Sequence, residues 1–400
     1  MKKILKVFLL VTLVCLMGIL FLTSCNDSSV SESTTESSTT TESSNTTGGV
    51  PNQHGQATVG SATFSYVVNQ DGQTCTLTRL VNYQDTDIVV PSVLDGYTVT
   101  RIDYSAFAYQ FDLTSIELPE TLIEIGSVAF SYCNKLVSVN IPDGVKTIGP
   151  GAFANCMKLK SITIPDSVTR LGTLESEEDY TLSESDGIFY NCNALETVII
   201  GNGVEKIGEY AFYYCVNLKN VQLGSGIKSI GTQAFWTCSR LENIEIPEGV
   251  TTLGHEVFYS CRSLRSIKLP DSVTEMGLHV FRLCIELTSA ELGNGITEIP
   301  ELTFAHCSKL TSVKLGDHLE EIDRYAFMGC TNLSVMELPN TLKNIEECVV
   351  DTCYALESIT FHGTKAEWEA ITKHNKWNQA WKQTGKEIKK IVCSDGEITF

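Results

Sequence analysis

The sequence has few basic residues and lacks the motifs that build catalytic or metal centres. Its 400 residues include 29 Lys and Arg against 48 Asp and Glu, which gives a formal charge of −19. A chain this acidic, with no basic stripe, is repelled by phosphate backbones, so we expect no nucleic-acid partner. It contains no H-E-x-x-H pair, no C-x-x-C pair and no G-x-S-x-G elbow. The sequence therefore predicts no enzyme, no metal site and no cofactor, with an undetected hydrolase as the alternative.

Long apolar runs are also scarce, and the one that stands out lies at the start of the chain. Three lysines precede sixteen mostly apolar residues, Val7 to Leu22. A spanning helix needs about 20 residues, so this run better suits a secretory signal. It ends in Leu-Thr-Ser-Cys25, which resembles the bacterial lipobox and implies that Cys25 is lipidated and becomes the mature N-terminus. An ordinary signal peptide and an uncleaved anchor are the alternatives, and each places the rest of the chain outside the cytoplasm.

Residues 26–57 contain almost no large apolar side chain and are rich in Ser, Thr and Glu. Such a segment cannot bury enough surface to offset the entropy of ordering. We therefore expect a disordered tether that holds the folded part roughly a few tens of Å from the membrane.

One pattern dominates the remainder: A-F-x-x-C-x-x-L-x-x-I-x-I-P-x-x-V-x-x-I-G. Its Phe slot recurs ten times after Phe107, and nine of the ten intervals are 23 residues while one is 36. A fixed period of this length indicates a solenoid, because a single repeat cannot bury its own apolar face and must stack on its neighbours. The slot is occupied by Phe107, Phe130, Phe153, Phe189, Phe212, Phe235, Phe258, Phe281, Phe304, Phe327 and Val350.

Each coil is predicted to contain one short parallel strand. Leu241 to Ile246 alternates apolar and polar residues, as a strand with one buried face does. A Pro or Gly turn follows, and then a second short extended or 3₁₀ segment. The boundaries predicted from these patterns are 1–25 for the signal and lipidation site, 26–57 for the tether, 58–98 for an N-terminal β cap, 99–361 for the solenoid with an insertion at 173–185, and 362–400 for a C-terminal cap with a short helix.

Ten cysteines occupy a single slot, three residues after the Phe. Extracellular cysteines often form disulfides. A strictly periodic column is more typical of a small apolar side chain that fills one interior position per coil. We therefore predict a mostly reduced, buried ladder, and no histidine is placed to turn it into a metal array.

A candidate ligand site lies one residue after the Phe. Because Phe and Cys point inward on either side, this slot is expected to point outward. Exposed aromatic rings suit sugar stacking or a protein anchor. An aromatic ladder that only shields the core edge is the alternative, as is binding on the Ser-rich strand face. The candidate residues are Tyr190, Tyr213, Trp236 and Tyr259, extended by Arg282 and by Tyr180 of the acidic insertion.

The Ile-Gly-x-x-Ala-Phe and Cys-x-x-Leu-x-x-Ile-x-Ile-Pro blocks resemble the BspA-like leucine-rich repeats of microbial surface proteins, through Val99 to Phe361. The resemblance implies a solenoid displayed outside the cell that binds host proteins or polysaccharides as an adhesin, with no catalytic residue to carry over. We thus expect a monomeric lipoprotein on the extracellular face of the bacterial membrane, attached by its lipid anchor only, that binds an extracellular or host protein. A glycan-binding protein and a passive spacer of the envelope are the alternatives.

Overall fold

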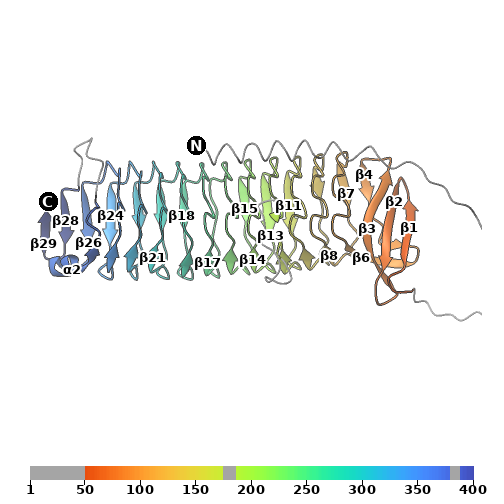
Figure 1. The fold of residues 1–400 in the computed structure, drawn as a ribbon, viewed down its shortest axis with the longest axis horizontal. Helices are drawn as coiled ribbons and strands as arrows, with labels where there is room; N and C mark the ends of the chain where they lie inside the picture. The colour runs from red at the N-terminus through yellow and green to blue at the C-terminus, as the bar shows by residue number, and fades with distance from the viewer. Residues whose placement is uncertain (1–49, 174–185, 379–387) are drawn as a thin grey trace, which may run out of the picture. The chain divides into compact units, whose positions relative to one another are not determined.

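The structure is a computed structural model that describes residues 50–173, 186–378 and 388–400, which belong to one compact unit. Cys25, the signal and most of the predicted tether lie outside the described residues, as does Tyr180 of the insertion. Figure 1 shows the coils stacked side by side, with the strands of successive coils in register. The predicted repeat solenoid is confirmed.

Most coils contain two strands, one on each long face of the stack. The first face, called here the strand face, holds the strands predicted from the alternating pattern and two strands of the C-terminal cap that were not predicted. They are β4 (Asp87–Val89), β7 (Ser115–Glu117), β9 (Ser138–Val139), β11 (Ser161–Ile164), β13 (Thr197–Ile200), β15 (Asn220–Gln222), β18 (Ser266–Lys268), β20 (Ser289–Glu291), β22 (Ser312–Lys314), β24 (Val335–Leu338), β26 (Ser358–Phe361), β28 (Lys390–Cys393) and β29 (Gly396–Thr399).

The second face holds two-residue strands, which are the short extended segments that the sequence predicted after the turn. Most pair in parallel with the equivalent residues of the neighbouring coils, as Ser229–Ile230 does with Thr252–Leu253. The pairing is interrupted between Arg170–Leu171 and Lys206–Ile207 and between Glu275–Met276 and Glu298–Ile299. They are β8 (Glu124–Ile125), β10 (Thr147–Ile148), β12 (Arg170–Leu171), β14 (Lys206–Ile207), β16 (Ser229–Ile230), β17 (Thr252–Leu253), β19 (Glu275–Met276), β21 (Glu298–Ile299), β23 (Glu321–Ile322), β25 (Asn344–Ile345) and β27 (Thr372–Lys373).

Both ends of the stack are capped. The N-terminal cap contains β1 (His54–Val59), β2 (Ala62–Val68), β3 (Thr74–Tyr83), β5 (Val93–Leu94) and β6 (Tyr97–Ile102). Because β1 begins at His54, the ordered part starts before the predicted boundary at 58. At the other end, the predicted short helix is α2 (Lys365–Ala370), which begins at a capping box where Thr364 and Glu367 bond to each other's backbone. Trp368 of this helix is buried and closes the core.

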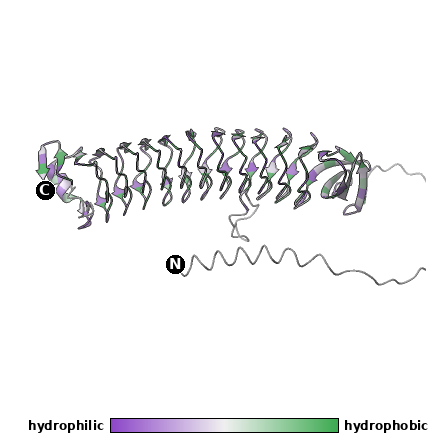
Figure 2. Ribbon diagram, turned by 90° about the horizontal axis from the view of Figure 1, so that it is seen from above, coloured by the Kyte–Doolittle hydropathy of each residue, from purple (hydrophilic) through white to green (hydrophobic). Residues whose placement is uncertain are grey.

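The core is a column of phenylalanine rings, one from each coil. Every ring from Phe107 to Phe327 is fully buried, and neighbouring centroids lie 5.0–5.7 Å apart in stacked pairs. That spacing is close to the distance of about 4.8 Å between paired strands, so ring stacking and strand pairing reinforce each other. Figure 2 shows hydrophobic and hydrophilic residues alternating around the coils, as this one-dimensional core requires.

The backbone around each Phe takes a left-handed conformation at two positions. In the coil of Phe130 these are Val128 (φ 49°) and Tyr132 (φ 61°), and the same two slots recur along the stack. The resulting turn aims alternate N–H groups at the next coil, where Phe130 N–H donates to the Ala152 carbonyl at 2.7 Å. For a residue with a Cβ this conformation costs roughly 1–2 kcal/mol, which the inter-coil hydrogen bonds offset.

Val128 is a β-branched residue in this left-handed slot, so Val128→Asn should stabilise the fold. Asn tolerates the conformation far better, and we expect the free energy of unfolding to rise by about 1 kcal/mol. Val137→Asn, on an exposed residue with ordinary backbone geometry, serves as the control and should give no gain. Thermal unfolding of both variants would test this, and equal melting temperatures would contradict it.

The cysteine column forms hydrogen bonds between coils. Each of its ten thiols donates to the carbonyl oxygen of the Phe in the preceding coil, at 3.1–3.3 Å, as Cys238 does to Phe212. All ten are buried, which confirms the predicted interior position of the column, and all ten are free thiols. Burial raises the pKa of Cys133 and Cys192 to about 12, so their thiolates are strongly disfavoured.

We predict that the column thiols of the folded chain resist alkylation at mildly alkaline pH. The thiolate is the reactive form, and burial suppresses both its formation and its access to the reagent. Iodoacetamide labelling followed by peptide mass spectrometry should show modification of the half-buried Cys348 first, and of the column only in denaturant. Fast labelling of the column in the folded protein would contradict this.

Candidate binding surfaces

The predicted aromatic file is present, but its rings stack on one another. Tyr190–Tyr213, Tyr213–Trp236 and Trp236–Tyr259 have centroid distances of 5.6, 4.6 and 5.5 Å and interplanar angles of 17°, 8° and 7°. The guanidinium of Arg282 lies 5.8 Å from the Tyr259 ring centroid and continues the column. The ring faces within the column are therefore taken by neighbouring rings.

The expectation that this slot points outward is wrong in part. Tyr213 is only 5% exposed, and Tyr190, Trp236 and Tyr259 are half-buried. The left-handed residue that follows turns the chain, so the slot lies along the core edge rather than above the surface. Only ring edges remain available to a ligand, which suits a sugar platform poorly.

Because the file packs against itself, we predict that Trp236→Ala destabilises the solenoid. Loss of a stacked, half-buried indole should lower the free energy of unfolding by about 3 kcal/mol, at the low end for a buried aromatic. Tyr104→Ala is the control, since Tyr104 is 68% exposed and should change stability by less than about 0.5 kcal/mol. Urea titration measures both. If Trp236→Ala left the free energy of unfolding unchanged, the aromatic file would again be a candidate ligand-binding site.

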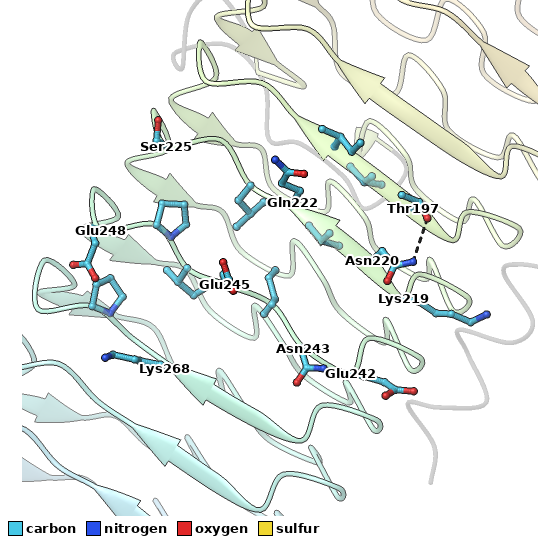
Figure 3. Close-up of a pocket in the computed structure, with 18 residues that line it drawn as sticks. Thr197, Lys219, Asn220, Gln222, Ser225, Glu242, Asn243, Glu245, Glu248 and Lys268 are labelled. Carbon is cyan, nitrogen blue, oxygen red and sulfur yellow. Dashed lines mark hydrogen bonds between the residues drawn. The ribbon is translucent and has the colours of Figure 1, made fainter.

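A groove opens on the strand face near the middle of the stack, between β15 and β18. Its volume is about 1360 Å³, and residues of four successive coils line it. Figure 3 shows Gln222, Asn243 and Glu245 around it. The coil that crosses the groove has no strand at residues 241–246, so the strand predicted there is absent and two sheets end at this point.

Backbone pairing across this coil is incomplete. On the next coils the Leu269 N–H donates to the carbonyl of Glu291 at 2.9 Å. The equivalent donors in the groove, the N–H groups of Leu223 and Ile246, have no backbone acceptor within the described part of the chain. The groove therefore presents open strand edges at one of the two breaks that divide the described strands of this face, the other being between β9 and β11.

The turn slot differs between this coil and the closed coils before it. A Cβ added to Gly224 would lie 2.2 Å from the carbonyl oxygen of Gly201, so these turns approach closely only because both residues lack a side chain. The next two coils carry Pro247 and Pro270 in this slot. A proline ring needs more room than glycine and offers no N–H. The same succession from Gly316 to Pro339 leaves Ser312 paired with Val335, so the proline accompanies the opening but does not by itself cause it.

A second contact between turns is lost at the same place. Elsewhere an Asn or Asp accepts from the next turn: the Asn202 side chain accepts the Ser225 N–H at 2.9 Å, and the Asp271 side chain accepts the Asn294 N–H at 2.8 Å. Ser225 has a shorter side chain, and no hydrogen bond joins it to Glu248 among the described residues. Sequence analysis treated Pro and Gly in this slot as equivalent turn formers and so missed the groove.

The groove carries unbalanced negative charge. Its two lysines, Lys219 and Lys268, have carboxylate partners on neighbouring coils, at 3.5 and 3.8 Å. Glu245 and Glu248 have no cationic partner among the residues that the structure describes. A ligand with positive charge would supply one.

A small aromatic cluster is exposed at the N-terminal end of the stack. Tyr109, Phe111 and Tyr132 are 58%, 51% and 39% exposed. The two Tyr rings stack at 5.1 Å and Phe111 meets Tyr109 edge-on at 6.1 Å. Both Tyr occupy the left-handed slot two residues after the Phe. That conformation lifts the side chain outward, a signal that alternation alone does not give.

A comparison with protein families matches residues 98–175, 183–311 and 297–372 to the BspA type leucine rich repeat region, in six copies. The chain belongs to the BspA-type leucine-rich repeat family. The family is typically a non-enzymatic scaffold for protein interactions.

Solved structures of bacterial leucine-rich repeat proteins resemble this BspA-type chain. A leucine-rich repeat protein from Bacteroides ovatus is 28% identical, with 79% of this chain and 90% of that one covered and a TM-score of 0.48. A leucine rich cell surface protein from Faecalibacterium prausnitzii is 30% identical, with 79% and 97% covered and a TM-score of 0.45. The pneumococcal vaccine antigen PcpA is 19% identical, with 80% and 98% covered and a TM-score of 0.37. A search of curated proteins found no match.

The described residues of this BspA-type protein hold no group of three or more His, Cys, Asp or Glu side chains placed to bind a metal. Over the same residues, no helix has the length and apolar character needed to cross a membrane.

Proposed function

We propose that this BspA-type protein is a surface lipoprotein, anchored through Cys25, that binds an extracellular or host protein in the strand-face groove. The groove carries the proposal, because it combines open backbone groups, uncompensated carboxylates and apolar side chains within one cavity. The similar protein from F. prausnitzii is described as a cell surface protein, which supports display outside the cell. The stacked aromatic file then stabilises the solenoid rather than forming the main contact.

Glycan binding is the second candidate, and the exposed cluster of Tyr109, Phe111 and Tyr132 favours it. Aromatic rings with free surface bind the apolar faces of sugars. This cluster has the exposure that the file at Tyr190–Tyr259 lacks. The two candidates therefore place the ligand at different positions along the described stack, near its middle and near its N-terminal end.

We predict that Asn243→Trp, which fills the groove, abolishes saturable binding of a protein ligand. The matched control is Ser289→Trp, in the same exposed strand-face file but on the fully paired β20. The full chain, solubilised in mild detergent, would be screened against arrayed extracellular proteins and glycans. Circular dichroism confirms that each variant is folded.

Loss of a protein ligand in Asn243→Trp, with retention in Ser289→Trp, supports the groove. A glycan ligand lost only in Tyr109→Ala/Tyr132→Ala would replace the proposal with the glycan function. Absence of any saturable ligand would overturn both and favour a passive spacer.

A further inference from the structure

The groove has the hydrogen-bonding pattern of an unfinished sheet. Besides the N–H groups of Leu223 and Ile246, the carbonyl of Lys219 and the N–H of Glu242 lack the partners that the equivalent groups have in neighbouring coils. In those coils the matching bond is made, as from the Thr288 N–H to the Arg265 carbonyl at 2.8 Å. Donors and acceptors at strand spacing are matched by a polypeptide backbone, in the manner of strand addition to a sheet edge.

The side chains of the groove form an inner apolar layer and an outer acidic layer. Ile244 and Ile246 are 7% and 8% exposed, more than most core residues, and Val221 and Leu223 are half-buried beside them. Glu245 lies on the outer side of the same segment. An extended chain presents successive side chains to opposite sides, so alternating apolar and basic residues would satisfy both layers.

We infer that the groove binds an extended peptide segment of its protein partner, in which apolar residues alternate with lysine or arginine. This inference rests on the proposed protein-binding function and names the chemistry of the partner. The peptide lies along the open coil, forms backbone hydrogen bonds with the unpaired edge groups, and places its cations beside Glu245 and Glu248.

The test uses a fluorescein-labelled peptide of about ten alternating Lys and Val residues, the length of a long strand. Fluorescence anisotropy with the full chain in mild detergent should show saturable binding. A Glu-Val peptide should bind at least about tenfold more weakly, because it repels the unpaired carboxylates. A Lys-Val peptide N-methylated at alternate residues should also bind at least about tenfold more weakly, because it cannot donate several backbone hydrogen bonds.

Two variants of the protein test the two layers separately. Glu245→Gln/Glu248→Gln should weaken binding by about fivefold, the effect of losing two exposed ion pairs. Glu117→Gln/Glu120→Gln is the matched control, since these residues hold the same two repeat slots in the coil of β7, outside the groove lining, and should have no effect. The double variant Ser225→Asn/Pro247→Gly introduces beside the groove the residue types found in the same two repeat slots where the coils are closed. Position 225 then matches Asn202, and position 247 matches Gly201. It should close the groove, raise the melting temperature and abolish peptide binding.

Equal binding of the N-methylated peptide, or unchanged binding by Ser225→Asn/Pro247→Gly, would overturn the inference. If the wild-type chain binds an arrayed protein that Asn243→Trp loses but does not bind the Lys-Val peptide, the peptide class is wrong and the proposed function stands. If it binds neither proteins nor peptides, both fail.

Discussion

The distance between successive coils is the constraint on which the rest of the structure depends. The phenylalanine rings hold it at 5.0–5.7 Å, close to the spacing at which parallel strands pair. Because each ring contacts only its neighbours, the core is a one-dimensional stack whose stability accumulates coil by coil. Any side chain between two coils must therefore fit that spacing or push the coils apart.

Two features of the repeat follow from this spacing: the cysteine in each coil, and the left-handed residues beside each Phe. A turn tight enough to aim alternate N–H groups along the stack leaves the Phe carbonyl pointing into the interior, where it receives the Cys S–H of the next coil. Cysteine is small enough for that slot and still provides a donor, although a weak one. The same turn forces residues such as Tyr132 and Tyr214 into left-handed geometry, which raises their rings to the surface. Packing and exposure thus share one cause.

The sequence predicts the period, the strand slots of all coils but the one at 241–246, the interior cysteine column and the short C-terminal helix, because each is a local pattern repeated or bounded within a coil. It does not predict which of two neighbouring slots faces water. Tyr213 and Tyr214 differ by one position, yet the first is buried and the second is 40% exposed, because a left-handed residue breaks the simple alternation. The outward orientation expected for the candidate residues is wrong for Tyr213 for that reason.

The groove was missed for a different reason, since it depends on pairs of coils rather than on one. A glycine permits its turn to touch the preceding one, as Gly224 does with Gly201, whereas the ring of Pro247 needs more room beside Gly224. A repeat profile treats the two residues as equivalent because each forms an acceptable turn within its own coil. In the stack they differ, since only glycine has no atoms to place between coils. An exchange that is neutral within the repeat therefore accompanies a polar, acidic groove where two sheets of the strand face end.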